Sequence, residues 1–149
     1  MNSFLALIKR ILEAFQDPQL KPTVDVPSPR DIIDQKNIIY DKVNKRVIIK
    51  GIEGPVWIVT VRNSNSMDPV VDYGHTCILT GDFEVDDLAI GDVVVYEKLN
   101  TNTVIHRISR ISHDSEGRYF TFKGDNNPIE DVLKVRDGQI AWLLLGVIY

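Results

Sequence analysis

Apolar residues near the N-terminus recur at helical spacing. In residues 3–16 they fall three or four positions apart, with Lys9, Arg10 and Glu13 between them. This spacing predicts an amphipathic helix and differs from that of a signal peptide. The polar face carries two positive charges and one negative. That charge favours docking of the apolar stripe on protein, with peripheral docking in a membrane interface as the alternative.

A proline-rich segment follows this predicted helix. Residues 17–29 contain four prolines, which remove backbone donors and stop a helix, so we expect a linker. Ser28, Pro29 and Asp31 then have the order of a helix start: a capping hydroxyl, a proline at the first helical position and a carboxylate in the first turn. A short helix that ends at about Gln35 is therefore predicted.

Residues 37–149 form a second unit with a different pattern, in which short β-branched and apolar runs alternate with turn residues. The first two runs, 38–43 and 46–50, flank Asn44-Lys45, which has the length and composition of a two-residue hairpin connection. No longer helical pattern separates the later runs, so we expect a mainly β fold, an antiparallel and partly open barrel or sandwich. The later runs are 56–61, 76–80, 93–96, 103–111, 118–123 and 140–148.

Length and charge exclude several classes of protein. The 149 residues suffice for one domain with a hydrophobic core, and the longest strictly apolar stretch, 140–149, is shorter than the roughly 20 residues of a membrane span. The net charge of −4 argues against nucleic acid as a partner. Cys77 is the only cysteine and no Cys/His spacing fits a zinc finger, so we expect no disulfide, metal or cofactor. A cytoplasmic or peripherally membrane-associated protein fits this composition.

Polar residues interrupt the β pattern at three places. Ser66 lies in the segment 63–69, His106 lies inside an apolar run, and Asp125 and Asp131 lie in the segment 124–131. A serine, a histidine and an aspartate are what nucleophilic acyl transfer requires, because the imidazole removes the hydroxyl proton and a carboxylate fixes the imidazole tautomer.

These three segments, with one more, resemble the conserved boxes of type I signal peptidases. Ser64-Asn65-Ser66-Met67-Asp68-Pro69 is similar to the S-x-S-M-x-P box, and residues 90–96 to the following G-D-hydrophobic strand. Val104-Ile105-His106-Arg107-Ile108 resembles the I-x-H-R-hydrophobic box, and residues 123–131 resemble K-G-D-N-N-x-x-x-D. The boxes stand in family order within residues 56–149 and resemble the archaeal and endoplasmic-reticulum branch. In that branch a histidine stands where the bacterial branch and the LexA-type self-cleaving repressors have a lysine.

The resemblance implies a signal-peptidase or LexA-like fold and a serine endopeptidase that cuts extended peptide or protein segments after small residues. Ser66 is then the nucleophile, His106 the general base and afterwards the general acid, and Asp131 the carboxylate behind the histidine. Asp125 is the second acidic residue, which either orders its loop or partners the histidine in place of Asp131.

The resemblance also assigns residues around the serine. The backbone N–H of Ser66 and the hydroxyl of Ser64 are expected to form the oxyanion site. Met67 and Pro69 are expected to lie beside the substrate, with Met67 packed inward beneath the serine. Asn65 stands where the family usually has glycine.

Other interpretations remain open at this point. Ser66 alone fits a turn residue, His106 a core histidine, and residues 125–131 a solvated loop; their joint occurrence in family order favours catalysis. The family carries a transmembrane helix before the serine box, whereas residues 56–61 read as a strand, so we expect a relative without that anchor. A weakly active or inactive β domain that binds peptides, and a LexA-like self-cleavage in the linker 17–29, are the alternatives.

Overall fold

The computed structural model describes residues 26–98 and 102–149. The predicted helix 3–16 and most of the predicted linker lie outside the described residues. No helix in the described ranges has the length and hydrophobicity needed to cross a bilayer.

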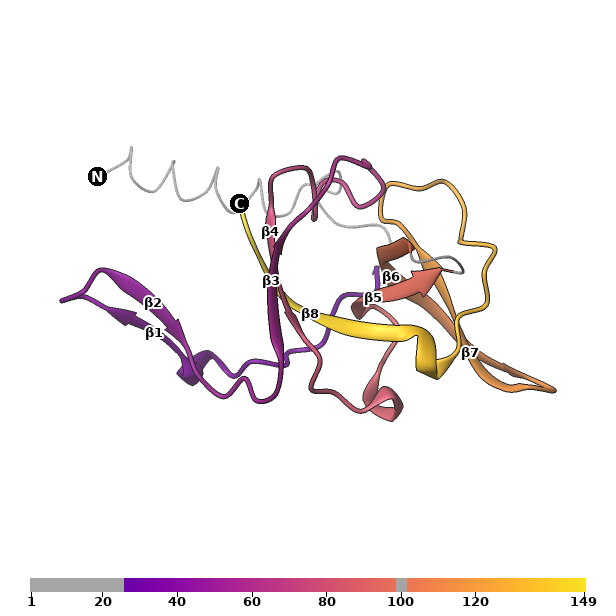
Figure 1. Cartoon of the computed structure of the whole chain (residues 1–149), viewed down its shortest axis with the longest axis horizontal. Helices are drawn as coiled ribbons and strands as arrows, with labels where there is room; N and C mark the ends of the chain where they lie inside the picture. The colour runs from indigo at the N-terminus through magenta and orange to yellow at the C-terminus, as the bar shows by residue number, and fades with distance from the viewer. Residues whose placement is uncertain (1–25, 99–101) are drawn as a thin grey trace, which may run out of the picture.

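The strands form two antiparallel sheets (Figure 1). A two-stranded ribbon is followed by a six-stranded sheet with the order β3-β4-β8-β5-β6-β7. The strands are β1 (Ile38–Asp41), β2 (Arg46–Ile49), β3 (Val56–Thr60), β4 (Thr76–Thr80), β5 (Val93–Lys98), β6 (Asn102–Asp114), β7 (Gly117–Lys123) and β8 (Ile140–Ile148), and the 3-10 turns are η2 (Gln35–Asn37), η3 (Val85–Asp87) and η4 (Asp137–Gln139).

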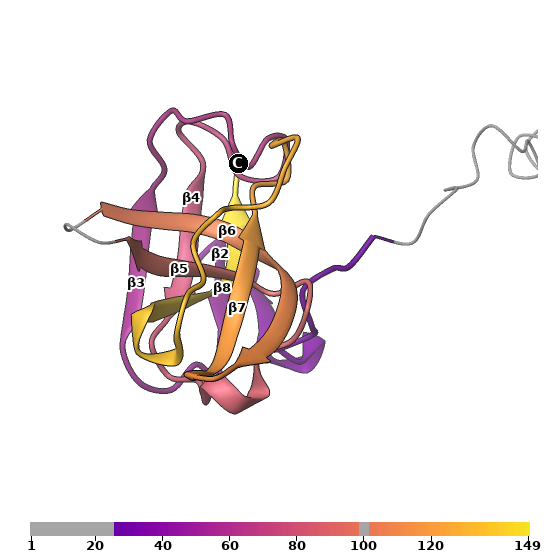
Figure 2. The same cartoon turned by 90° about the vertical axis from the view of Figure 1, so that its right-hand side faces the viewer.

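The predicted mainly β, antiparallel class is confirmed. Strands β5 and β6 cross β3 and β4 at a steep angle, so the large sheet is strongly bent (Figure 2). Within the described residues β3 and β7 are its two edges and do not pair with each other. The sheet is therefore not a closed barrel.

The short helix predicted from Pro29 to Gln35 is wrong. Residues 26–34 have no helical structure, and the first ordered turn is η2, where the Asp34 carboxylate accepts from the Lys36 N–H at 3.0 Å. The Arg30 N–H and Nε instead donate to the fully buried Asp92 at 3.2 and 3.0 Å. This ion pair joins residues 62 positions apart, so local helix signals could not reveal it.

The first hairpin is confirmed, but its connection is longer than predicted. β1 and β2 pair from Ile38↔Ile49 to Asp41↔Arg46, which leaves four residues in the turn. The Asp41 carboxylate accepts from the N–H groups of Val43 and Asn44 at 3.1 Å each. An aspartate that binds the backbone two and three positions later builds this wider turn.

The core lies on both sides of β5. Alternate residues of a strand point to opposite faces, and here both faces are covered. Val93 and Val95 pack in one buried cluster with Met67, Cys77 and Leu144, whereas the other cluster contains Val94, Tyr96, Ile108, Phe120, Phe122 and Leu143.

Candidate active site

Ser66 lies in the loop that connects β3 to β4, and two neighbours fix its backbone. Asn65 has φ +56°, a left-handed conformation that asparagine adopts more readily than other residues with a Cβ. Met67 is 2% exposed and packs into the core, and its carbonyl accepts from the N–H groups of Val70 and Val71 at 3.0 Å each. The backbone at Asn65 explains why asparagine can stand at the usual glycine position.

His106 connects the serine loop with the segment that follows β7. It lies on β6, opposite Val94 of β5, and is 5% exposed. Its Nε2 is 3.0 Å from Ser66 Oγ and its Nδ1 is 2.6 Å from Asp131 Oδ2. The structure thus brings Ser66, His106 and Asp131 into one hydrogen-bonded row.

The row has the connectivity of a nucleophile, a base and an orienting carboxylate. When Nδ1–H donates to Asp131, the lone pair of Nε2 faces the Ser66 hydroxyl. Burial of the imidazole lowers the local dielectric, which strengthens its interaction with the carboxylate. This arrangement can remove the serine proton during attack on a carbonyl carbon.

Asp125 lies in a different environment from Asp131. Its two carboxylate oxygens accept from Arg107 Nε and Nη2 at 2.8 and 2.7 Å, and Arg107 Nη1 donates to the Gly91 carbonyl at 2.8 Å. The guanidinium therefore occupies both oxygens of Asp125, and this carboxylate anchors its loop.

The loop that Asp125 anchors also holds the serine. The Asn126 N–H donates to the Ser66 carbonyl at 3.0 Å, and the Asn126 side-chain amide donates to the Asn65 carbonyl at 2.9 Å. Gly124 approaches so closely that a Cβ there would lie 2.5 Å from the Ser66 carbonyl oxygen. The Arg107–Asp125 pair thus fixes the loop that carries Ser66 through contacts to its main chain.

The other predicted site residues surround the serine. Ser64 Oγ lies 3.3 Å from Ser66 Oγ, at an exposed position. Pro69 is exposed and follows a cis peptide bond. Met67 is buried, as expected of a residue packed beneath the serine, and its sulfur accepts from the Asp125 N–H at 3.4 Å. Its burial leaves Met67 little surface to offer a substrate.

Sequence reasoning missed Tyr96. Its hydroxyl donates to Asp131 Oδ2 at 2.6 Å, and its side chain is fully buried. Burial, together with the hydrogen bond to Asp131, raises the pKa of Tyr96 above its ordinary value, so the phenol keeps its proton. In the sequence Tyr96 ends an apolar run and reads as a core aromatic residue.

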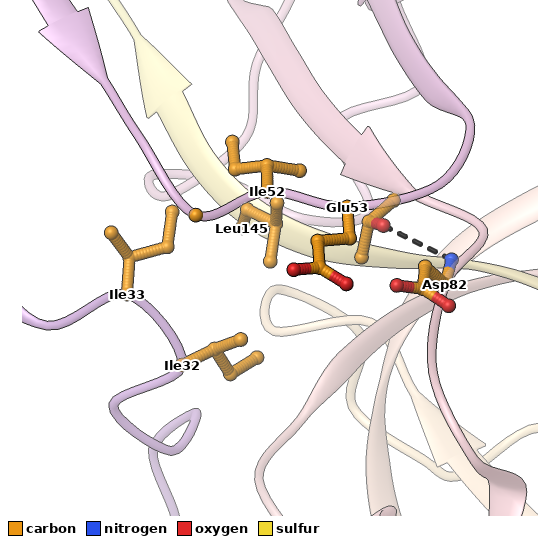
Figure 3. Close-up of a pocket in the computed structure, with 8 residues that line it drawn as sticks. Ile32, Ile33, Ile52, Glu53, Asp82 and Leu145 are labelled. Atoms are coloured by element: carbon orange, nitrogen blue, oxygen red, sulfur yellow. Dashed lines mark hydrogen bonds between the residues drawn. The ribbon is translucent and has the colours of Figure 1, made fainter. Parts of the chain in front are cut away.

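Two cavities differ in their relation to this row. One, of about 420 Å³, is lined by Lys98 and residues 127–133, including Asp131. The other, of about 200 Å³, lies between Ile32, Leu145 and the carboxylates of Glu53 and Asp82, and contains no member of the row (Figure 3). Within the described ranges, no three His, Cys, Asp or Glu side chains are grouped so that they could hold a metal ion.

Comparison with known proteins shows a distant, partial similarity of this chain to signal peptidase subunits. The chain is 30% identical over 99 residues to the human "Signal peptidase complex catalytic subunit SEC11C", covering 65% of this chain and 49% of the relative. It is 33% identical over 86 residues to the "Signal peptidase complex catalytic subunit SEC11" from Scheffersomyces stipitis, covering 57% of this chain and 49% of the relative. No protein-family model and no solved structure matches.

The chain spans about half the length of the curated relatives that it matches. The similarity is distant and partial, and it supports a relationship to the type I signal peptidases. Relatives of that kind imply a serine protease.

Proposed function

We propose that this protein is a signal-peptidase-like serine endopeptidase of the branch that uses histidine as the base. Its partner is a peptide or protein substrate that binds in an extended conformation and is cut after small residues. The observation that carries the proposal is the hydrogen-bonded row of Ser66, His106 and Asp131, with its distances of 3.0 and 2.6 Å. Similarity to signal peptidase catalytic subunits supports it independently.

In the proposed reaction, Ser66 Oγ attacks the scissile carbonyl carbon while His106 Nε2 takes the hydroxyl proton. Negative charge develops on the carbonyl oxygen, where the Ser66 N–H and the Ser64 hydroxyl act as donors. His106 then gives its proton to the leaving amine, and the acyl group remains on Ser66. A water molecule, deprotonated by His106, releases the acyl group and restores the serine.

Two strand edges near the row support an extended substrate. Within the described residues, β3 pairs only with β4, so its other edge is free of strand partners. Residues 102–106 of β6 pair only with β5, because the pairing between β6 and β7 extends from Asp114 only as far as Arg107. Val59 of β3 and Ile105 of β6 pack against the same buried cluster as Met67. A peptide added to either edge gains main-chain hydrogen bonds close to Ser66.

Mass spectrometry of a diverse peptide library, including signal-peptide sequences, tests the proposal. We expect cuts after small residues by the wild type, and a loss of nearly all of this cleavage in the Ser66→Ala and His106→Ala variants. Folded wild-type protein that binds peptides and cuts none would contradict the proposal and favour a peptide-binding β domain. Intact-protein mass in the same samples tests self-cleavage, since only the wild type would then lose an N-terminal fragment.

A further inference from the structure

We propose that Tyr96 is a positioning residue for the same reaction, whose hydroxyl holds Oδ2 of Asp131 against His106 and shares the charge of that oxygen. This inference rests on the proposed function. Tyr96 touches Asp131 and not the serine, so it acts through the carboxylate.

The Tyr96 hydroxyl has a fixed place because its ring cannot move freely. The ring is fully buried and stacks on Phe122, with 4.5 Å between ring centroids and 18° between ring planes. Strand β5, which carries Tyr96, pairs on one side with β6 and on the other with β8. A side chain held in this way presents its donor at a defined point.

Asp131, in contrast, lies in a segment without regular secondary structure. Its neighbour Val132 is 95% exposed and Ile129 is 71% exposed, and the cavity of about 420 Å³ adjoins its side chain. One main-chain bond anchors it, from the Asp131 N–H to the Phe122 carbonyl at 2.7 Å. The Tyr96 hydroxyl adds a fixed donor to a carboxylate that its own segment holds by this one main-chain bond, and the imidazole is its second partner.

The two donors also divide the charge of one oxygen. Tyr96 Oη and His106 Nδ1 each lie 2.6 Å from Asp131 Oδ2. A hydrogen bond from the phenol stabilises the carboxylate charge and weakens its attraction for a protonated imidazole. Removal of the hydroxyl therefore favours the protonated histidine, which moves the titration midpoint of His106 to higher pH.

The hydrogen bonds and ion pairs given for the other charged groups near the row do not involve the Tyr96 hydroxyl. Lys98 and Glu130 line the same cavity as Asp131, and Glu130 is paired with Arg110. Arg107 lies on β6 and is paired with Asp125, which lies in the segment after β7. Lys123 is the last residue of β7. A change in the histidine midpoint on Tyr96→Phe thus reports the phenol itself.

The test is NMR titration of the His106 ring in wild type, Tyr96→Phe and a control, Tyr40→Phe, whose ring is 60% exposed on the β1–β2 ribbon. We expect Tyr96→Phe to raise the midpoint by about one to two units, the size expected for the loss of one hydrogen bond to a charged group. Tyr40→Phe is expected to leave it unchanged. An unchanged or lower midpoint in Tyr96→Phe overturns the proposal.

Two further readouts separate this inference from the proposed function. The titration midpoint of His106 is measured by NMR without any turnover, so this test of the inference can be made even if no peptide is cut.

In the wild type, the buried Tyr96 hydroxyl proton is expected to exchange slowly with solvent and to resonate at low field. Rapid exchange of this proton overturns the inference without any variant. Where cleavage is measured, Tyr96→Phe is expected to lower kcat about tenfold with KM unchanged and to shift the acidic limb of the pH profile upward. A change in KM alone contradicts it.

Discussion

The two ends of the segment that follows β7 carry the same residue type in two different environments. The Asp125 and Asp131 side chains are similarly buried, with 19% and 12% of their surface exposed. Both carboxylates accept two short hydrogen bonds. Burial and bond number therefore do not distinguish them.

The donors make the difference. Asp125 is held by the guanidinium of Arg107, which is charged at every accessible pH. Asp131 accepts from a phenol and from an imidazole, which gains a positive charge when it takes up a proton. A carboxylate paired with a permanent cation is a structural anchor, whereas one paired with a titrating base can stabilise a charge that appears during a reaction.

The largest effect that follows from this comparison is on catalysis by Asp131→Asn. The variant keeps the size of the side chain but loses the charge that orients and stabilises protonated His106. We expect kcat/KM for a cleaved peptide to fall roughly 10³- to 10⁴-fold. The thermal unfolding midpoint, measured by circular dichroism, is expected to change little, and a cleavage rate close to wild type would refute the assignment.

Asp125→Asn is expected to act on stability instead. It leaves Arg107 partly buried beside a neutral amide, and bonds between charged partners of this kind contribute about 2 to 3 kcal/mol. Urea unfolding is expected to show a loss of that size. Arg107→Lys is the matched control, because it keeps the charge but not the two-pronged geometry, and about half of the loss is expected. Unfolding curves that coincide with wild type would show that the pair does not anchor the loop.

Substitutions of Asn65 test how far the anchored loop depends on its left-handed residue. Asn65→Gly is expected to change the free energy of unfolding by less than about 1 kcal/mol, since glycine adopts φ +56° without strain. Asn65→Val is expected to cost about 1 to 2 kcal/mol, because its Cβ is strained in this conformation. Equal stability of the two variants in urea would contradict this account of the turn.

The smallest effect concerns Asp114, a carboxylate held by cations at the surface. A hydrogen bond from Lys134, aided by Arg136, lowers the pKa of Asp114 to about 2. The lowered pKa stabilises the fold above the ordinary pKa of the carboxyl, and this contribution disappears as the pH falls through about 2. Asp114→Asn is thus expected to lower Tm slightly at pH 6 and not at all below pH 2. An equal difference at both pH values would contradict the linkage.

The short β-branched and apolar runs between turn residues predict the strands well, because runs of this length and composition are typical of buried strands. Runs 56–61 and 118–123 correspond to β3 and β7 almost residue for residue. The start signals at Ser28 and Pro29 mislead, because the partner that fixes this segment is Asp92, far along the chain. Local patterns do not contain such long-range contacts.

The site shows the same division between local and spatial information. Ser66, His106 and both aspartates are visible in the sequence as polar residues within recognisable boxes. The choice between Asp125 and Asp131 as the neighbour of the histidine depends on geometry, since both lie in one box. Tyr96 was missed because a tyrosine in a buried strand looks the same whether its hydroxyl binds a carboxylate or not. The catalytic roles of these residues stay predictions.

The central claim, that Ser66, His106 and Asp131 act as one unit, is tested most directly by combining their substitutions. The measurement is kcat/KM of Ser66→Ala, of His106→Ala and of the variant that combines Ser66→Ala, His106→Ala and Asp131→Asn, on one cleaved peptide. Residues that work as a unit lose their function together, so the combined variant is expected to be no slower than Ser66→Ala alone. Losses that multiply from one substitution to the next, or a Ser66→Ala variant that cleaves like the wild type, would contradict the claim.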